Sequence, residues 1–343
     1  MKLHGVSLKE GNNMVIKFNF FQALAGDSIL ISTDNTNILI DGGFGITYEE
    51  QIKPKLNRIE NVLDLVVLTH IDEDHICGLI EMIKNDRKNT AKIQKLWFNS
   101  IKSIRVHKNR NVSVSYGQGL TFDDLLKEYD VPVNNEIFLT DSYNQKKYTI
   151  NQEIELQLLS PYSSDLIILE EKEPKNQNPT ECRKNKVTQV STKLGGDKRP
   201  PNKSSIAFIL KYDTKKILFL ADANIDVINK SLMNLGYSED NKLNVEFVKL
   251  SHHGSKENIN EDFLKMINTD KFIILTDGKN KCNGHPSKEI FPLIIEHHAK
   301  GKDIEFIFNY EGIKNRKLQE IKDDNVDLTR CSFKVLTNNF LEL

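Results

Sequence analysis

The most chemically distinctive stretch of the chain runs from Val66 to Ile83 and reads VVLTHIDEDHICGLIEMI. At least four side chains that can bind a metal fall within six positions, at His70, Asp72, Asp74 and His75. Imidazole nitrogen and carboxylate oxygen are ligands for Zn²⁺, Mn²⁺ and iron. His70 and Asp72 can point the same way from an extended turn, whereas Asp74 and His75 begin the predicted helix that follows. One short loop can therefore serve two ions.

An alternative role for one of the carboxylates is a helix N-cap. Asp72 or Asp74 could accept hydrogen bonds from the first backbone amides of the helix. Capping alone does not account for the His and Asp residues that end apolar strands elsewhere in the chain. These are Asp41 after NILI, Asp222 after LFLA, His252 and His253 in KLSHHGS, and Asp277 after IILT, with His285 a few positions further on. Because ligands gather at strand ends, where loops aim side chains at one point, the set indicates a metal centre.

Strand and helix patterns alternate in both halves of the chain. Runs rich in β-branched and aromatic residues end in turn signals, and runs with a 3.6-residue period lie between them. The predicted strands span residues 14–21, 27–33, 36–43, 63–70, 92–100, 204–213, 215–224, 243–254, 271–280, 303–310 and 331–343. The predicted helices span residues 46–62, 75–86, 121–130, 224–237, 259–268 and 287–301. Strands and helices mixed in this way indicate an α/β fold, with sheets covered by helices.

The composition is that of an ordinary soluble domain. The 343 residues are 38% hydrophobic and 28% charged, with a formal net charge of −1, which argues against a surface coated uniformly for nucleic acid. No apolar run approaches the roughly 20 residues needed to span a bilayer, and the N-terminus lacks the apolar core of a secretory signal. We therefore expect no membrane association and a cytoplasmic location. The four cysteines form no C-x-x-C pair, which argues against a zinc ribbon.

Residues 162–203 differ from the rest of the chain. Pro, Asn, Lys and Gly dominate this segment, so it reads as a loop or insertion within a single domain that spans residues 14–343. Its second part is strongly basic. One interpretation is a solvated loop, and the other is a basic flap that holds a polyanionic substrate. The second interpretation makes candidate substrate-binding residues of Arg183, Lys184, Lys186, Lys198 and Arg199.

The segment HIDEDHICGL resembles the metal loop H-x-[HD]-x-D-H-x-G-G of the metallo-β-lactamase superfamily. The resemblance extends in order through AGDSILI, NILIDGG, NKSSIAFIL, KKILFLAD, VKLSHHGS and GHP, in scattered blocks from about residue 15 to residue 300. Asp at the second ligand position, together with HHGS and GHP, is similar to one branch in particular. That branch is the hydrolase domain of ComEC-type competence proteins, regarded as a DNA nuclease, and its free-standing relatives. The channel segment of competence proteins is not seen in this sequence, so a role in DNA uptake is not expected.

This resemblance implies an αββα sandwich with the site at one edge, between two mixed sheets. It also implies two divalent metal ions, Mn²⁺ or Zn²⁺. Carried over residue by residue, the ligands are His70 and Asp72 on the first ion, Asp74, His75 and His253 on the second, and Asp222 bridging both. Asp41 matches the aspartate that supports the metal loop from behind.

Two positions depart from the family pattern. Many members have a histidine where Asn202 is the nearest match here, and an amide oxygen is a weaker ligand, so we expect the first ion to be held loosely. Cys77 takes the place of the first glycine in the G-G pair. We expect it to pack as a small buried side chain.

Several polar residues beside the implied ligands have open roles. His252 is a ligand, a general acid or a structural neighbour. His285 suits substrate contact or proton transfer, since imidazole titrates near neutral pH. With Asp74, these two histidines are the candidate catalytic residues. Ser255 and Lys256 contact a substrate phosphate, or else solvent and the start of the next helix.

The leading functional hypothesis is a two-metal phosphodiesterase or nuclease acting on DNA or another nucleic acid. The ions would deprotonate a water and stabilise the charged oxygens of a displacement at phosphorus. One alternative is hydrolysis of a small ester, thioester, lactam or cyclic nucleotide. Another is a module of a multi-protein assembly, such as a defence system, that is gated by a protein partner. Partnership with another protein or with a second copy is left open.

Overall fold

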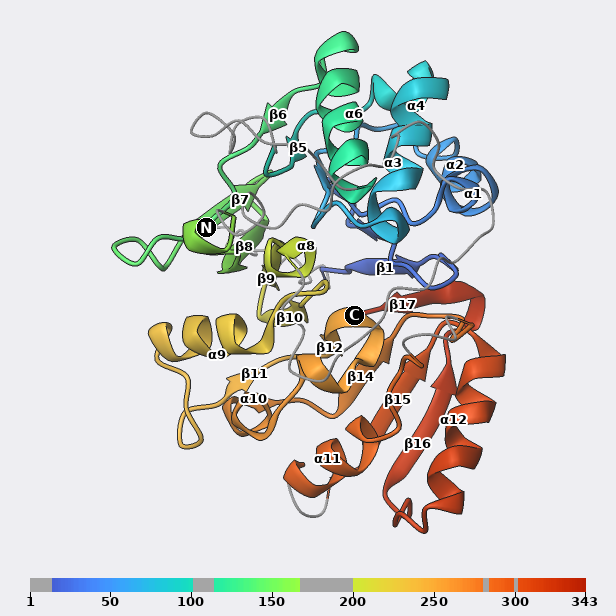
Figure 1. The fold of residues 1–343 in the computed structure, drawn as a ribbon, viewed down its shortest axis with the longest axis vertical. Helices are drawn as coiled ribbons and strands as arrows, with labels where there is room; N and C mark the ends of the chain where they lie inside the picture. Colours follow the sequence, from blue (N-terminus) through green and yellow to red (C-terminus); the bar gives the residue numbers. More distant parts are fainter. Residues whose placement is uncertain (1–13, 101–113, 167–199, 280–283, 299–301) are drawn as a thin grey trace, which may run out of the picture.

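The computed structural model describes residues 14–100, 114–166, 200–279, 284–298 and 302–343. Two large sheets lie face to face, and helices cover the outer face of each (Figure 1). The predicted α/β class and αββα sandwich are confirmed. The extent of the domain, residues 14–343, stays a prediction. Of the proposed insertion at 162–203, residues 167–199 lie outside the described part of the chain.

The first sheet has seven strands in the order β17-β1-β2-β3-β4-β5-β6. Their bounds are β1 Lys17–Phe20, β2 Ile29–Ser32, β3 Asn37–Ile40, β4 Leu65–Val67, β5 Leu96–Trp97, β6 Val133–Asn134 and β17 Phe340–Glu342. The strands from β17 to β3 pair antiparallel, and those from β3 to β6 pair parallel. The metal loop therefore leaves the carboxyl end of a parallel strand, β4.

The second sheet has eight strands in the order β16-β15-β14-β12-β10-β9-β8-β7. Their bounds are β7 Lys147–Ile150, β8 Ile154–Ser160, β9 Ala207–Tyr212, β10 Lys215–Phe219, β12 Val248–Lys249, β14 Lys271–Ile274, β15 Ile304–Phe308 and β16 Cys331–Val335. Its parallel half begins at β10, so β10, β12 and β14 end at one edge. A separate pair joins β11 (Leu243–Asn244) to β13 (Ile267–Asn268).

Helices enclose the two sheets on opposite sides (Figure 1). The first sheet packs against α1 Gly45–Thr47, a π-helix at Tyr48–Ile52, α2 Lys53–Leu56, α3 Glu73–Asn85, α4 Arg87–Thr90 and α6 Val114–Glu128. The second packs against α9 Ile225–Asn234, α10 Glu261–Met266, α11 Ile290–His297 and α12 Glu311–Asp323. The short helix α8 covers Pro200–Lys203, and 3-10 turns span Ser251–Gly254, Lys256–Asn258 and Thr337–Asn339.

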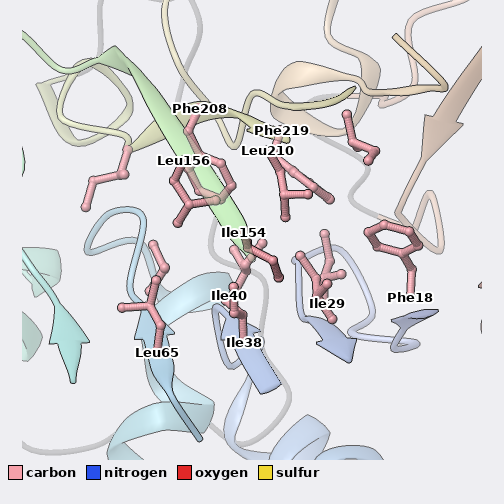
Figure 2. Packing of buried hydrophobic residues seen from close by; sticks show 14 of the residues in the cluster. Phe18, Ile29, Ile38, Ile40, Leu65, Ile154, Leu156, Phe208, Leu210 and Phe219 are labelled. Carbon is pink, nitrogen blue, oxygen red and sulfur yellow. The ribbon is translucent and has the colours of Figure 1, made fainter. Parts of the chain in front are cut away.

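Period-two alternation divides each central strand between two cores. In β3, Ile38 and Ile40 face the second sheet, whereas Leu39 faces the helices. In β9, Phe208 and Leu210 face the first sheet in the same way. Figure 2 shows these side chains meeting between the sheets. This middle core fixes the separation of the two sheets and so the separation of the loops at their edge.

Some elements differ from the sequence prediction. The strand predicted over 243–254 is split into β11 and β12. Its last residues form a 3-10 turn, because His252 and His253 have positive φ angles, 47° and 55°. The hairpin β7–β8 and helix α12 were not predicted. Helix α6 begins at Val114, earlier than the predicted residue 121. Among the described helices, none combines the length and the apolar character that crossing a membrane requires.

Candidate metal centre

The metal loop is positioned by the buried strand β4. Leu65, Val66 and Val67 are fully buried, and the chain leaves this strand for the edge of the sheet before α3 begins at Glu73. Asp72 occupies the N-cap position of α3, but its side chain makes no capping hydrogen bond. Its Oδ2 lies 3.7 Å from His70 Nε2 instead. Capping therefore does not explain Asp72.

Asp41 supports the loop from behind at the end of β3. Its carboxylate accepts hydrogen bonds from the Thr69 amide and the Thr69 hydroxyl, each at 2.8 Å. The same carboxylate lies 2.8 Å from His75 Nδ1. An ionised Asp41 places a proton on Nδ1 and leaves the lone pair of His75 Nε2 facing the centre. The Thr69 hydroxyl, 3.1 Å from His70 Nδ1, has the same effect on that ring.

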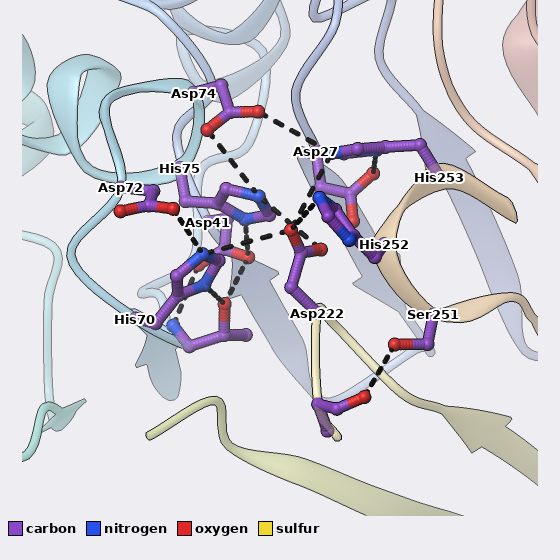
Figure 3. Close-up of polar contacts among 12 residues, drawn as sticks. Asp27, Asp41, His70, Asp72, Asp74, His75, Asp222, Ser251, His252 and His253 are labelled. Carbon is purple, nitrogen blue, oxygen red and sulfur yellow. Dashed lines mark hydrogen bonds and ion pairs between the residues drawn. The ribbon is translucent and has the colours of Figure 1, made fainter. Parts of the chain in front are cut away.

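Asp222 lies in the middle of the centre, just after β10. Its distances to imidazole Nε2 atoms are 3.7 Å from Oδ1 to His75, and 3.9, 3.7 and 3.9 Å from Oδ2 to His70, His252 and His253. In Figure 3 the imidazoles of His70 and His75 approach Asp222 from the metal loop, and those of His252 and His253 approach from the other side. One carboxylate is thus shared by four imidazoles from two sheets.

The buried polar atoms of this centre fit a divalent cation. Within the described residues, Nε2 of His70, His75 and His253 and Oδ1 of Asp222 have no hydrogen-bond partner. A buried polar atom left in this way costs about 1–3 kcal/mol. Two groups have ligand atoms within 4.8 Å of one another: His70–His75–Asp222 and Asp74–His75–His253.

His75 belongs to both groups, yet its single free nitrogen can serve only one ion. Two ligand atoms on one tetrahedral Zn²⁺ lie roughly 3.4 Å apart, given bonds near 2.1 Å. Asp74 lies 3.5 Å from His253 Nε2 and 3.9 Å from His75 Nε2, which is near that spacing. His75 Nε2 also lies 3.7 Å from Asp222 Oδ1, so these distances fit His75 in either group.

The crowded charges shift the pKa values of these groups. Burial alone would lower the pKa of both His75 and His253, but nearby carboxylates outweigh it. Asp222, Asp41 and Asp74 raise the pKa of His75 well above its usual value. Asp27 and Asp222 raise the pKa of His253 to about 9. Burial would raise the pKa of Asp74 and Asp222, but the imidazoles beside them hold both below the usual range.

His252 and His285 lie together at the edge of the centre. Their ring centroids are 4.6 Å apart, and His285 is half-buried in the loop before α11. His252 Nδ1 lies 3.1 Å from Asn258 Oδ1, while the Asn258 amide donates to the carbonyls of Asp222 and Ala223. The sequence placed both histidines near the site. Asn258, which ties His252 to the strand end at Asp222, was not anticipated.

The other predicted site residues have more ordinary surroundings. Ser255 Oγ accepts a hydrogen bond from the Glu257 amide at 3.3 Å, and Lys256 pairs with Glu289 at 3.0 Å on the surface. These contacts match the solvent and helix-start alternative, and substrate contact stays a prediction. Asn202 is fully buried in α8, and its role as a ligand also stays a prediction. The basic residues Arg183, Lys184, Lys186, Lys198 and Arg199 lie outside the described part of the chain.

Sequence reasoning missed two charged residues behind His253. Asp27 precedes β2 and Lys249 lies in β12; both are buried and form an ion pair with each other. Burial would raise the pKa of Asp27, but Lys249 and His253 hold it below its usual value. A lysine inside the apolar run FVKL was the available signal, because lysine is almost never fully buried without a partner.

Residues 22–142 match the family model described as the Metallo-beta-lactamase superfamily. Similar solved structures include the metallo-beta-lactamase fold protein YhfI from Bacillus subtilis, 12% identical over 96% of this chain and 100% of that one, with a TM-score of 0.45. Zn²⁺-bound PqqB from Methylobacterium extorquens is 10% identical over 96% and 99%, with a TM-score of 0.46. The short form of human tRNase Z is 11% identical over 96% and 98%, with a TM-score of 0.40. No curated protein matches the chain.

Proposed function

We propose that the chain is a two-metal hydrolase of phosphodiesters with the metallo-beta-lactamase fold, and the match of residues 22–142 to the Metallo-beta-lactamase superfamily model supports this. The observation that carries the proposal is the position of Asp222, whose carboxylate lies within 3.9 Å of four imidazole Nε2 atoms. A carboxylate shared in this way suits an ion on each side of it.

Each part of the centre has a proposed task. His70 and Asp72 would hold one ion, Asp74, His75 and His253 the other, and Asp222 both. Divalent ions held there would supply Lewis-acid chemistry and make water a nucleophile near neutral pH. Asp41 keeps the ring of His75 aimed inward. His252, held by Asn258, and His285 are placed to move a proton at the open edge.

Nucleic acid is the proposed substrate class, and the proposed relatives are the free-standing hydrolases similar to ComEC-type domains. The motifs HHGS and GHP and the acidic second ligand Asp72 support this branch. Two ions bridged by a carboxylate suit displacement at phosphorus, where the attacking and the leaving oxygen both carry charge. A cytoplasmic location belongs to the same proposal.

The test is a plasmid-nicking assay on chelator-stripped protein after Mn²⁺ or Zn²⁺ is added singly, beside small phosphodiesters, carboxylic esters and lactams. We expect nicking and phosphodiester turnover that His75→Ala abolishes. Asp277→Asn is the matched control, because Asp277 also ends a strand but contacts Lys279 and lies outside both ligand groups. Turnover of esters or lactams alone would overturn the proposal. So would an inactive protein with its ions bound, which would indicate a gated module.

The proposal also predicts which metal ion gives the highest turnover. Asp72 makes the surroundings of the first ion richer in oxygen than a three-histidine site, and oxygen ligands suit Mn²⁺, although raw affinity favours Zn²⁺. We expect Zn²⁺ to bind well and Mn²⁺ to give the higher turnover, with Asp72→His shifting the preference toward Zn²⁺. Full activity with Zn²⁺ and none with Mn²⁺ would contradict this assignment.

A further inference from the structure

A buried ion pair, formed by Asp27 and Lys249, lies behind His253 at the candidate metal centre. The side chains of Asp27 and Lys249 are 3% and 1% exposed, and they form an ion pair. Asp27 lies in the loop that leads into β2 of the first sheet, whereas Lys249 belongs to β12 of the second. The pair therefore links the two sheets at the edge where the ligands of the centre meet.

Asp27 contacts two of the three residues proposed to hold the second ion. Its Oδ1 lies 3.3 Å from His253 Nδ1, a nitrogen that is also 2.9 Å from the Leu275 carbonyl. Its backbone amide donates to the Asp74 carbonyl at 3.3 Å. Asp74 and His253, in turn, face each other at 3.5 Å through their side chains. Asp27 thus contacts two neighbouring ligands, one through its backbone and one through its side chain.

The close approach of the Asp27 loop to α3 depends on Gly26. A Cβ at this position would lie 1.9 Å from the Asp74 carbonyl oxygen and 2.8 Å from the Asp74 Cβ. Any side chain here would push the loop away from the first turn of α3. The backbone therefore fixes where the Asp27 carboxylate stands relative to His253.

A gain in stability alone does not explain why Asp27 and Lys249 are buried as an ion pair. Apolar replacement of such a pair is often neutral or stabilising, because removing two charges from water is expensive. The other histidine of this group, His75, offers a comparison. The Asp41 carboxylate lies 2.8 Å from its Nδ1 and so orients its ring. Histidines that bind metals commonly have a carboxylate or a carbonyl at the second ring nitrogen, which sets ring orientation and basicity.

The balance of charges in the centre supports the same role for Asp27 and Lys249. Asp41, Asp72, Asp74 and Asp222 carry four negative charges, which two divalent ions would balance. Asp27 is a fifth carboxylate, and the Lys249 ammonium beside it balances that charge. Lys249 also engages Asp27 Oδ2, the oxygen that does not face His253, which stops the carboxylate from turning into the centre as an extra ligand.

We propose that Asp27 and Lys249 are positioning residues that hold His253 for the second ion. Asp27 and the Leu275 carbonyl together orient the His253 ring so that Nε2 faces the ion, and Lys249 orients and neutralises Asp27. This inference rests on the two-ion centre of the proposed function and deepens it. It predicts that loss of the pair weakens one of the two ions and leaves the other unchanged.

The test measures Zn²⁺ binding to chelator-stripped protein by competition with a chromophoric chelator, with urea unfolding measured in parallel. The variants are Asp27→Asn and Asp27→Asn/Lys249→Met. The double variant leaves no unpaired buried charge, so it keeps the fold if the single variant unfolds. We expect one ion to bind roughly 10–100-fold more weakly in both, as for other residues that orient a ligand. Asp86→Asn is the control, since Asp86 joins a polar network with Tyr48 and Asn89 outside the centre.

A cycle with His253 separates positioning from a purely structural role. In a His253→Ala background, Asp27→Asn should cause no further loss of affinity, because its effect passes through that ring. Wild-type affinity for both ions in the double variant, or an equal loss in the His253→Ala background, would overturn the inference. Failure of the wild-type protein to bind two ions would instead overturn the proposed function.

Discussion

Asp74 and His75 are adjacent in sequence but connect to different surroundings. His75 is fully buried and reaches back to Asp41, whereas the Asp74 side chain is 25% exposed and faces His253. The Asp74 carboxylate lies 3.9 Å from the His75 imidazole and 3.5 Å from that of His253, and the three form one of the two groups of described residues that could hold a metal ion. Their loss should therefore affect metal content before it affects the fold.

We predict that Asp74→Asn and His75→Ala each remove most bound metal and nearly all hydrolysis. Elemental analysis of purified protein checks the first part, and circular dichroism checks that the fold persists. Asp277→Asn should keep its metal. Full metal content in both variants would show that these residues are not ligands.

The same groups predict how stability responds to pH in protein stripped of metal. The folded-state pKa of His253 is about 9 and that of His75 is also raised, against about 6.5 in the unfolded chain. A raised pKa gives stability that is complete below about pH 6.5 and is lost as pH rises through the folded value. We expect the Tm of stripped protein to fall between pH 6.5 and 9, and His253→Ala to reduce that slope. A Tm that stays level or rises over this range would contradict the assignment.

Added Zn²⁺ should reverse that trend. A histidine must lose its proton before it binds a metal, so metal affinity rises with pH. The stabilisation that Zn²⁺ gives should therefore grow between pH 6 and pH 8, as a larger shift in Tm at fixed free ion. A constant shift would mean that no protons leave when the ion binds.

Helix α3 shows why one of the two glycines expected after the metal loop can be replaced. Gly78 meets the loop after β3 backbone to backbone, and a Cβ there would lie 1.9 Å from the Gly42 carbonyl oxygen. Cys77 is buried on a different side of the helix, with Sγ 3.6 Å from the Gln118 side-chain nitrogen in α6. The departure from the family pattern therefore falls where a side chain has room.

We predict that Gly78→Ala destabilises the fold by about 1–3 kcal/mol, the range for overpacking a close contact, and shifts the metal loop. Cys77→Ala should be better tolerated, because it removes one atom and adds none. Urea unfolding measures both, and equal effects of the two substitutions would contradict this account.

The elements that sequence patterns predicted are those with a clear apolar period. Strand β4 is wholly apolar, and eight of the thirteen residues of α3 are buried. Helix α12 escaped prediction because its buried side chains are only Ile313, Lys317 and Ile321, one per turn on a highly charged helix. The hairpin β7–β8 was missed although Ile154, Leu156 and Leu158 alternate along its second strand.

In the candidate site, too, only patterns that are local in the sequence could be predicted. His70 to His75 could be identified from the sequence because their spacing is local. The ion pair of Asp27 and Lys249 spans 222 positions, so only the packing of the two sheets reveals it. Asn258 holds His252 through one turn of irregular backbone that no periodicity predicts.

At the scale of the whole molecule, the formal net charge is −1, so a polyanion would have to be held by a local cluster of basic residues. The predicted feature is the basic stretch 183–203. Neutralising Arg183, Lys184, Lys186, Lys198 and Arg199 should weaken DNA binding and flatten its salt dependence, because fewer counterions are released. Turnover of a small phosphodiester should change little. Binding at low and moderate salt measures the effect, and unchanged affinity would mean an ordinary solvated loop.

The division of the ligands between two sheets also governs when the centre can form during synthesis. The ribosome adds about 5–20 residues per second, so His253 follows His75 by roughly 10–35 s. Until Asp222 is added, a nascent chain carries His70, Asp72, Asp74 and His75 without either of the other two proposed ligands. An ion that arrives in that time would meet four of the six proposed ligands, before the second sheet is complete. We therefore expect metal to bind only late in synthesis, and the first sheet itself is completed last, by β17 at Phe340–Glu342.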